Sequence, residues 1–236
     1  MTEAEFLAAY TPGDYARPSV TVDIAVLTVR DGSLQVLLIR RGGHPYRGCW
    51  ALPGGFLDVG DGVRDQGEDL DAAAHRELEE ETSLPAGSCW LEQLATFGRP
   101  GRDPRMRVIT VAYFALVRPA LVPLVRARTD AREACWFPLF ALPELAFDHA
   151  EILAATLARI RDRLHHAPIA FDLVPDTFTA SELRVVVQAV GGEPVHAPNF
   201  QRRIARMVEE GVLVPVSGES RRAGGRPARL YRFRGR

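Results

Sequence analysis

Carboxylate side chains are concentrated in one short stretch of this 236-residue chain, residues 62–84 (GVRDQGEDLDAAAHRELEEETSL). Glu77, Glu80 and Glu81 follow the spacing i, i+3 and i+4, so that in a helix they project from one face. Apolar residues spaced by four predict that the other side of this helix is buried. Hard cations such as Mg²⁺ take oxygen ligands, commonly one or two carboxylates together with a substrate phosphate. The stretch therefore predicts a site for Mg²⁺ or Mn²⁺.

The same spacing has a simpler interpretation, in which the acidic face is only solvated. A like-charge pair at i, i+4 costs about 0.2–0.5 kcal/mol in a helix, so energy alone does not demand a cation. The wider sequence bears on the choice, because a pattern of glycine, glutamate, arginine and apolar positions extends over Gly62, Glu68, Arg76 and Leu84. This pattern resembles the Nudix box, the signature of hydrolases that cleave nucleoside diphosphates linked to another group. The resemblance implies a Nudix fold around the helix.

The resemblance to the Nudix box also implies roles for individual side chains. It implies metal ligands at Glu68, Glu77, Glu80 and Glu81, and a catalytic group formed by Glu77, Glu80, Glu81 and Arg76. Arg76 is expected to orient the carboxylates by ion pairing rather than to touch the metal. One position departs from the box, because Ser83 stands where the box has a glycine that ends the helix.

A second motif, LPGG at residues 52–55, resembles the segment that precedes the box. Residues 56–67 then form a longer connection to the box glutamate than typical members have. We expect the diphosphate of a ligand to be bound by Arg40, Arg47, Gly54 and Gly55. The alternative for these arginines, and for the arginine-rich loop at residues 99–107, is that they are only solvated. His149 lies where a later helix begins and is expected to be structural rather than catalytic.

Length and composition bound the class of protein. A chain of 236 residues is long enough for two domains, and its 47% hydrophobic and 25% charged residues are ordinary for a globular protein. No apolar run reaches the roughly 18 residues of a membrane span, and no basic flank with an apolar core suggests a secretory signal. The three cysteines are scattered and in no metal-binding spacing, as is typical of a reducing compartment. We therefore expect a cytoplasmic protein with no membrane partner.

The net charge of -1 is unevenly distributed along the chain. The final residues 221–236 contain seven arginines and no acidic residue, and every basic side chain of the chain is an arginine rather than a lysine. Arginine suits the recognition of phosphate groups because its planar guanidinium donates in a fork. A basic C-terminal region behind an acidic N-terminal one predicts an anionic partner for the tail.

Residues 1–18 are mixed in composition and contain Pro12, Gly13 and Pro18, so we expect a loose N-terminal arm. The resemblance to the Nudix box implies a Nudix domain at residues 19–167. Strands are predicted at residues 19–30, 34–41, 50–56, 90–97, 107–117 and 134–139. A second helix is predicted from Asp148 to about residue 166, because Leu153, Leu157 and Ile160 continue an apolar stripe at helical spacing. Strands interleaved with two such helices fit the α/β fold class, with the αβα sandwich and mixed sheet that the Nudix resemblance implies.

Residues 168–236 are predicted to form a separate DNA-binding domain. Thr179 and Glu182 form a capping box before a helix at residues 180–190, and a second helix is predicted at about 199–210. Strands at 212–216 and 230–233 flank a flexible basic loop at 217–226. This is the layout of a winged helix-turn-helix, whose second helix enters the major groove while the wing contacts the backbone. The expected DNA contacts are Gln201, Arg202, Arg203, Arg206, Arg221, Arg222 and Arg226. The alternative is an α+β appendage with a solvated basic face.

Taken together, the two halves resemble the Nudix-related transcriptional regulators of NAD metabolism. The resemblance rests on LPGG, on RELEEET at residues 76–82, on FDHAEI at 147–152, on NFQRR at 199–203, and on GRPARLYRF at 225–233. It implies a homodimeric repressor of NAD metabolism genes that binds operator DNA and is released when its Nudix domain binds ADP-ribose or a related NAD-derived nucleotide. The alternative is an ADP-ribose pyrophosphohydrolase whose tail serves dimerisation or docking. In the repressor, we expect the hinge between domains at residues 165–175.

Overall fold

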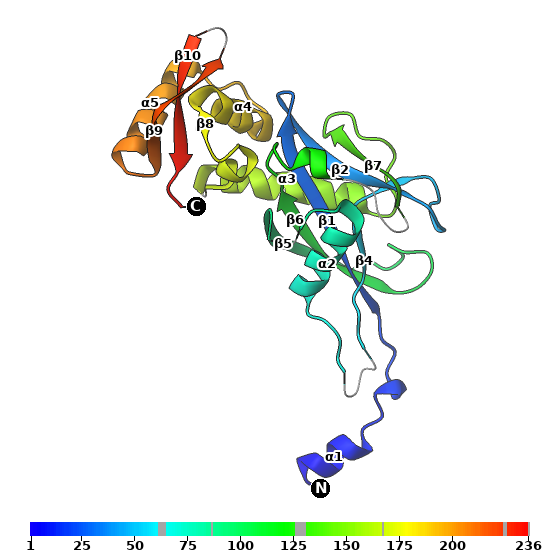
Figure 1. Ribbon diagram of the computed structural model, residues 1–236. Coiled ribbons are helices and arrows are strands. Elements are labelled where there is room, and N and C mark those ends of the chain that lie inside the picture. The colour runs from blue at the N-terminus through cyan, green and yellow to red at the C-terminus, as the bar shows by residue number, and fades with distance from the viewer. Residues whose placement is uncertain (61–64, 86, 126–130, 167, 224–225, 236) are drawn as a thin grey trace.

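The computed structural model describes residues 1–60, 65–85, 87–125, 131–166, 168–223 and 226–235 (Figure 1). Gly62, which belongs to the glutamate-rich motif, lies outside these residues. The chain forms a larger domain built on a sheet, followed by a smaller C-terminal domain of helices and a hairpin. The first residues extend away from both domains (Figure 1).

The larger domain is organised around a mixed seven-stranded sheet with the strand order β3-β2-β1-β6-β5, in which β4 also pairs with β1 and β7 with β2. The two central strands, β1 (Ser19–Arg30) and β6 (Val108–Leu116), run parallel, and the other pairs are antiparallel. The remaining strands are β2 (Ser33–Arg41), β3 (Trp50–Ala51), β4 (Gly54–Phe56), β5 (Trp90–Phe97) and β7 (Ala131–Pro138). The single strand expected at residues 50–56 is therefore two short strands.

One helix covers each face of this sheet. Side chains alternate along β1, so Val22 and Ile24 enter the core beneath α2 (Leu70–Thr82), whereas Ala25 and Leu27 enter the core beneath α3 (His149–His166). Because both faces of β1 are covered, its sequence reads as a continuous apolar run rather than an alternating one. The predicted αβα sandwich is confirmed.

The C-terminal domain has the elements of a winged helix. Its helices are α4 (Ala180–Gly191) and α5 (Ala197–Glu209), and its sheet has the order β8-β10-β9. The strands are β8 (Phe178–Thr179), β9 (Leu213–Ala223) and β10 (Arg226–Phe233). The expectation of a flexible loop at residues 217–226 was wrong, because β9 and β10 remain paired out to Ala223 and Arg226. Backbone pairing overrides a composition of glycine, serine and arginine that is unfavourable for strands.

The segment between the two domains is not a loose linker. It forms a 3-10 helix, η3 (Pro168–Leu173), that buries Ile169, Phe171 and Leu173. These side chains belong to one apolar core that continues from α3 in the first domain to α4 in the second. The segment in which a hinge was expected, residues 165–175, is therefore packed from Ile169 onward, and residue 167 lies outside the described residues.

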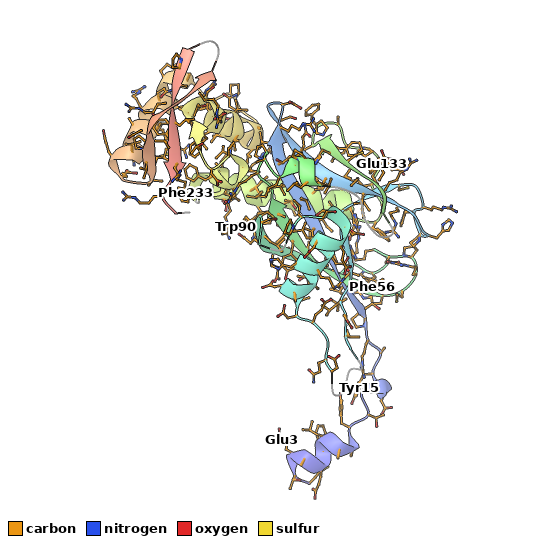
Figure 2. The ribbon with its side chains drawn as sticks, in the orientation of Figure 1. Glu3, Tyr15, Phe56, Trp90, Glu133 and Phe233 are labelled. Carbon is orange, nitrogen blue, oxygen red and sulfur yellow. The ribbon has the colours of Figure 1, made fainter. Side chains whose placement is uncertain are left out.

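The N-terminal arm is less loose than expected. It contains a short helix, α1 (Glu3–Ala9), that begins with a capping box between Thr2 and Glu5, and a 3-10 turn, η1 (Pro12–Asp14). No residue of α1 is buried, and Figure 2 shows Glu3 and Tyr15 away from the body of the molecule. A further 3-10 turn, η2 (Val122–Leu124), follows β6. Among the described helices, none combines the length and the apolar character needed to cross a bilayer.

Candidate functional site

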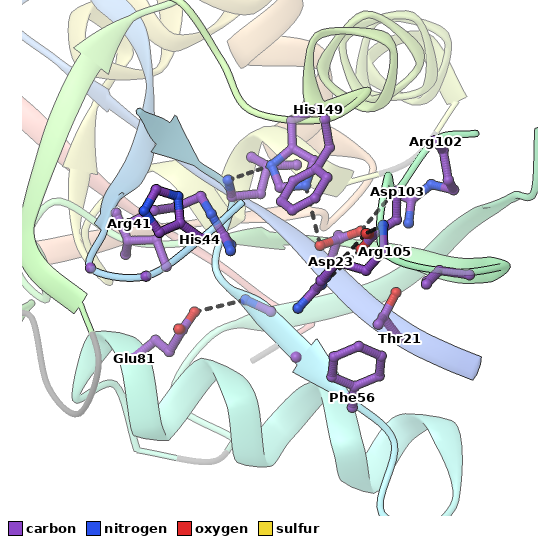
Figure 3. Close-up of a pocket in the computed structure, with 18 of the residues that line it drawn as sticks. Thr21, Asp23, Arg41, His44, Phe56, Glu81, Arg102, Asp103, Arg105 and His149 are labelled. Carbon is purple, nitrogen blue, oxygen red and sulfur yellow. Dashed lines mark hydrogen bonds and ion pairs between the residues drawn. The ribbon is translucent and has the colours of Figure 1, made fainter. Parts of the chain in front are cut away.

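A cavity of about 310 Å³ opens at one end of the central strands, between β4 and the N-terminus of α3. Figure 3 shows that charged side chains surround it from several directions. Asp23 comes from β1, Arg41 from β2, Glu81 from α2, Arg102 and Arg105 from the loop before β6, and His149 from α3. Segments far apart in the sequence therefore meet at one polar pocket.

The carboxylates on α2 are held together by Arg76. Its guanidinium donates to Glu77 at 2.7 Å and to Glu80 at 3.3 Å, and it binds both carboxylate oxygens of Glu68. Glu77 is buried, whereas the side chain of Glu80 is half exposed. Arg76 thus has the orienting contacts predicted for it. Glu68 also accepts from the backbone N–H of Asp58, so its contacts are those of a support for Arg76.

The two glycines of LPGG pack directly against these carboxylates. The N–H of Gly54 donates to Glu81 Oε2 at 2.7 Å. A Cβ atom at Gly55 would collide with the carboxylate of Glu77, so that a larger residue here would displace this carboxylate. The two glycines therefore pack against the acidic helix, of which Glu81 lines the pocket, whereas Glu77 and Glu80 are not among the described lining residues.

The charge state of these carboxylates is governed by burial. Burial raises the pKa of Glu81 to about 8, although the hydrogen bond from Gly54 lowers it, and neighbouring Glu77 and Asp23 raise it further. Burial also raises the pKa of Glu77, against the lowering effect of Arg76. Among the residues that the structure describes, no group of three or more His, Cys, Asp or Glu side chains is arranged to hold a metal ion. The carboxylates of Glu77 and Glu81 are nevertheless of the chemical type that Mg²⁺ takes as ligands beside a phosphate and water.

Beneath the pocket, Arg102 joins two elements in a buried ion network. Its side chain is only 4% exposed and donates to both oxygens of Asp148, at 2.8 and 2.6 Å, and to Asp23 at 3.2 Å. Burial raises the pKa of Asp23, but the proximity of His149 and Arg102 outweighs it and brings the pKa to about 2. The loop at residues 99–107 is therefore not simply solvated. Arg102 thus links β1 to the start of α3 through its hydrogen bonds to Asp23 and Asp148.

His149 supports the glycine turn rather than projecting a free nitrogen into the pocket. Its Nδ1 accepts the backbone N–H of Leu52 at 2.8 Å, and its Nε2 lies 3.4 Å from Asp23. An accepting Nδ1 places the proton of the neutral ring on Nε2. These contacts agree with the structural role expected for His149.

The cations at the mouth of the pocket differ in part from those expected. Arg40 lines the pocket and pairs with Glu133 at 3.7 Å, but Arg47 is exposed and is not among the lining residues. Arg41 and Arg105, which were not predicted individually, also line the cavity. Burial and the neighbouring charge of Arg105 lower the pKa of Arg41, which indicates two guanidinium groups near each other.

Both of these guanidinium groups lie over aromatic rings. Arg41 is 4.8 Å from the ring centre of Phe147, and Arg105 is 5.4 Å from that of Phe56. Arg105 also pairs with Asp103 at 2.7 Å. No local sequence pattern identifies Arg105, because its loop is brought to the pocket only by the pairing of β6 with β1.

Ser83 takes the conformation that the motif glycine would take. It is the C-cap of α2 with a left-handed φ of 64°, and its N–H donates to Glu79 O at 2.9 Å. The helix therefore ends at the expected position in spite of the substitution.

The second candidate site is the outer face of α5. Phe200 and Ile204 are buried, and the predicted DNA contacts Gln201, Arg202, Arg203 and Arg206 are all exposed. Arg202 bonds to Asn199, and Arg206 pairs with Glu210 at 2.9 Å. The arginines therefore form a cationic face opposite the buried stripe.

On the wing, Arg221 pairs with Glu182 at 2.7 Å and donates to Thr177 O, which attaches the end of β9 to α4. Arg222 and Arg226 lie near the tip of the hairpin, opposite Pro227 and Ala223 respectively. All three wing arginines therefore lie toward the tip, and Arg221 has a partner in α4.

Comparison with protein families gives two matches that follow one another along the chain. The NUDIX domain model matches residues 19–156, and the NrtR DNA-binding winged helix domain model matches residues 170–233. The first contains the acidic helix and the pocket, and the second contains α4, α5 and the wing.

Two known proteins, one of them represented by two solved structures, resemble the chain over most of its length or over the larger domain. The ADPR responsive transcriptional repressor NtrR of Acinetobacter baylyi is 38% identical over 232 residues, which is 98% of this chain and 88% of that protein. The crystal structure of Shewanella oneidensis NrtR complexed with a 27mer DNA is 32% identical, with a TM-score of 0.75 over 91% of this chain and 93% of that chain.

The NUDIX domain of Shewanella oneidensis NrtR complexed with ADP ribose is 36% identical, with a TM-score of 0.58 over 68% of this chain and 99% of that chain. Pocket, acidic helix and winged helix are thus matched by the same group of proteins. The chain belongs to the NrtR family, in which a Nudix domain is followed by a DNA-binding winged helix.

Proposed function

We propose that this chain is a transcriptional repressor that responds to ADP-ribose. Its Nudix domain binds the nucleotide, its winged helix binds operator DNA, and binding of the nucleotide releases the DNA. One observation carries this proposal. The polar pocket and the cationic helix α5, which we call the reading helix, belong to one molecule with a continuous apolar core. The relative that is named an ADPR responsive repressor spans both of these parts.

The pocket suits a nucleoside diphosphate because several arginines line it together with the backbone of two glycines. Arg41 and Arg105 lie near each other, and although Asp103, Glu81 and Asp23 offset part of their charge, a diphosphate would offer both guanidinium groups charged acceptors. We propose that Arg40, Gly54 and Gly55 also contact the diphosphate. On the side of α2, Glu81 and the adjacent Glu77 and Glu80 would hold Mg²⁺ or Mn²⁺. Such a cation neutralises phosphate charge when it is bound.

The winged helix suits DNA through α5. A helix of this size fits the major groove, where Arg and Gln side chains read guanine and adenine edges. We propose that Gln201, Arg202, Arg203 and Arg206 enter the groove, while Arg222 and Arg226 approach the phosphates. A homodimer would present two such helices to two half-sites about one helical turn apart. The targets we propose are genes of NAD metabolism.

A reciprocal titration tests the proposal. An operator would first be selected from random duplexes with the full chain, and its affinity would then be measured with and without saturating ADP-ribose. We expect ADP-ribose to weaken DNA binding by about 5- to 150-fold, and DNA to weaken ADP-ribose binding by the same factor. AMP, which lacks the diphosphate, is the control ligand and should have little effect. Equal affinities in the presence and absence of ADP-ribose would contradict the sensor.

A second function, hydrolysis of ADP-ribose to AMP and ribose 5-phosphate, is favoured by one observation. Arg76 pairs with both Glu77 and Glu80, and Glu81 follows one turn after Glu77 on the same helix, which supports the acidic group predicted from the sequence. Product formation would be measured by chromatography with Mg²⁺ or Mn²⁺ present. If the group is catalytic, Glu80→Gln should abolish turnover, with Glu79→Gln as the neighbouring control. Equal turnover by wild type and Glu80→Gln would remove the catalytic assignment.

A further inference from the structure

The helix α3 connects the ligand pocket with the winged helix. At its N-terminus, Phe147 and His149 line the pocket and Asp148 holds the buried Arg102. The helix then continues for 18 residues, a length of about 27 Å at 1.5 Å per residue. An uninterrupted helix transmits a displacement of one end to the other as a rigid element. A ligand that contacts Phe147 or His149 therefore acts on an element that extends to the second domain.

At the far end of α3, Arg161 caps the C-terminus of α4. Its Nε donates to the carbonyl oxygen of Val190 at 3.1 Å. Gly192 ends α4 in a left-handed conformation with φ of 81°, and a Cβ atom there would lie only 2.9 Å from a terminal nitrogen of Arg161. The last carbonyls of a helix lack partners within the helix, and a cation near them interacts favourably with the helix dipole. Arg161 thus provides, from the Nudix domain, a partner for a terminal carbonyl of α4 in addition to the glycine C-cap of that helix.

This cap lies where the orientation of the reading helix is set. The turn that follows Gly192 leads directly to α5, and it is braced by Gln188, whose Oε1 accepts the N–H of Val195 at 3.3 Å. Arg184 donates both to Gln188 and to the Val195 carbonyl. A movement of the α4 C-terminus would therefore be transferred to the start of α5. Arg161 is the α3 side chain whose hydrogen bond reaches this terminus.

We propose that Arg161 is the positioning residue that couples the ligand pocket to the reading helix. The inference rests on the proposed function, and it names the contact through which ligand binding changes DNA affinity. Arg161 lies outside both the pocket and the α5 face, and it is exposed. Removing its side chain should therefore leave the two binding sites intact while weakening the connection between them.

The test compares two arginines on the same helix. Arg163 is two residues further along α3, and it pairs at 2.7 Å with Glu92 on β5, within the Nudix domain. DNA affinity would be measured for the full chain, R161A and R163A, each with and without saturating ADP-ribose, on the same selected duplex. The readout is the coupling ratio, which is the DNA affinity without ADP-ribose divided by the DNA affinity with it. The affinity for ADP-ribose in the absence of DNA is measured separately by calorimetry.

For R161A we expect a coupling ratio of less than about twofold, against about 5- to 150-fold for wild type, with unchanged ADP-ribose affinity. R163A should keep the wild-type ratio, and R161K, which again places a cation at the Val190 carbonyl, should recover most of it. R161Q keeps much of the side-chain volume without the charge and should behave like R161A, so the result does not depend on one truncation.

Three outcomes would overturn the inference. A wild-type ratio in both R161A and R161Q would show that the coupling runs through other contacts. An equal loss in R163A would show that any perturbation of α3 suffices. Loss of DNA binding by R161A without ligand would show that Arg161 maintains the winged helix itself rather than coupling it to the pocket. If wild type itself has a ratio of one, the proposed sensor fails, and the inference with it.

Discussion

At the scale of single residues, the buried network around Arg102 determines the floor of the pocket. Three carboxylate oxygens from Asp148 and Asp23 surround a guanidinium that is 4% exposed. Desolvation offsets much of the attraction within a buried ion pair, so the network is weak evidence for high stability. Removing one partner is different, because it leaves a buried charge without compensation.

Asp23→Asn should therefore destabilise the protein at neutral pH by about 3–5 kcal/mol. The pKa of Asp23 is lowered from 3.8 to about 2, so its contribution to the free energy of unfolding is fully present above pH 3.8 and is lost as pH falls through 2. The difference between wild type and Asp23→Asn should thus shrink by about 1 kcal/mol between pH 7 and pH 3. Urea denaturation at the two pH values measures this.

Asp31→Asn is the matched control for this change. Asp31 pairs with Arg30 at 3.3 Å, but its side chain is 79% exposed, so the same substitution should alter stability by less than about 0.5 kcal/mol. An effect of Asp23→Asn that did not depend on pH would contradict the assignment of a depressed pKa to this carboxylate.

At the scale of elements, the two faces of α5 have different roles. Phe200 and Ile204 attach the helix to the core, and the exposed arginines are left for an anionic partner. If Arg202 and Arg203 each contact a phosphate, R202A/R203A should reduce the log–log salt slope of DNA binding by about 1.8, at 0.9 for each contact. Fluorescence anisotropy on the selected duplex, repeated over a series of salt concentrations, measures this slope.

R159A/R163A is the control for that measurement. Both arginines pair with Glu92 on the Nudix domain, so the double variant changes the net charge equally but not on the α5 face. Its salt slope should equal that of wild type. A slope that falls equally in both double variants would mean that only overall charge matters, and the groove-binding role of α5 would then be contradicted.

At the scale of the whole molecule, the two domains share one core. Phe171 of η3 stacks on Phe233 of β10 at 4.3 Å between ring centres, and the same apolar cluster includes Ile160 and Leu164 of α3. A hydrophobic core that crosses a domain boundary makes unfolding of either part expose the surface of the other. The domains should therefore unfold together.

Two probes can test this cooperativity. All three tryptophans, Trp50, Trp90 and Trp136, lie in the Nudix domain, so their fluorescence reports that domain, whereas far-ultraviolet circular dichroism reports both. We expect coincident urea transitions from the two signals. Phe171→Ala should shift both midpoints downward together, since truncating a buried phenylalanine costs about 3–5 kcal/mol. Two separated transitions would show that the shared core does not couple the domains.

Local features of the sequence were sufficient to predict most of the helices and strands and the acidic side of the pocket. The spacing of Glu77, Glu80 and Glu81 places them on one helix face, and the capping box of Thr179 and Glu182 marks the start of α4. Helical periodicity and capping involve residues three or four positions apart, so they can be read without knowing the fold.

Only the tertiary structure decided the rest of the pocket and the connection between the domains. Arg102 meets Asp23 across 79 residues and Asp148 across 46, because the parallel pairing of β1 with β6 brings its loop beside the start of α3. Arg161 meets the Val190 carbonyl across 29 residues, because η3 folds α4 back against α3. Such contacts depend on how strands and helices pack in three dimensions. The sequence determined which elements form, and their packing determined which charges face the ligand and which residue connects the pocket to the reading helix.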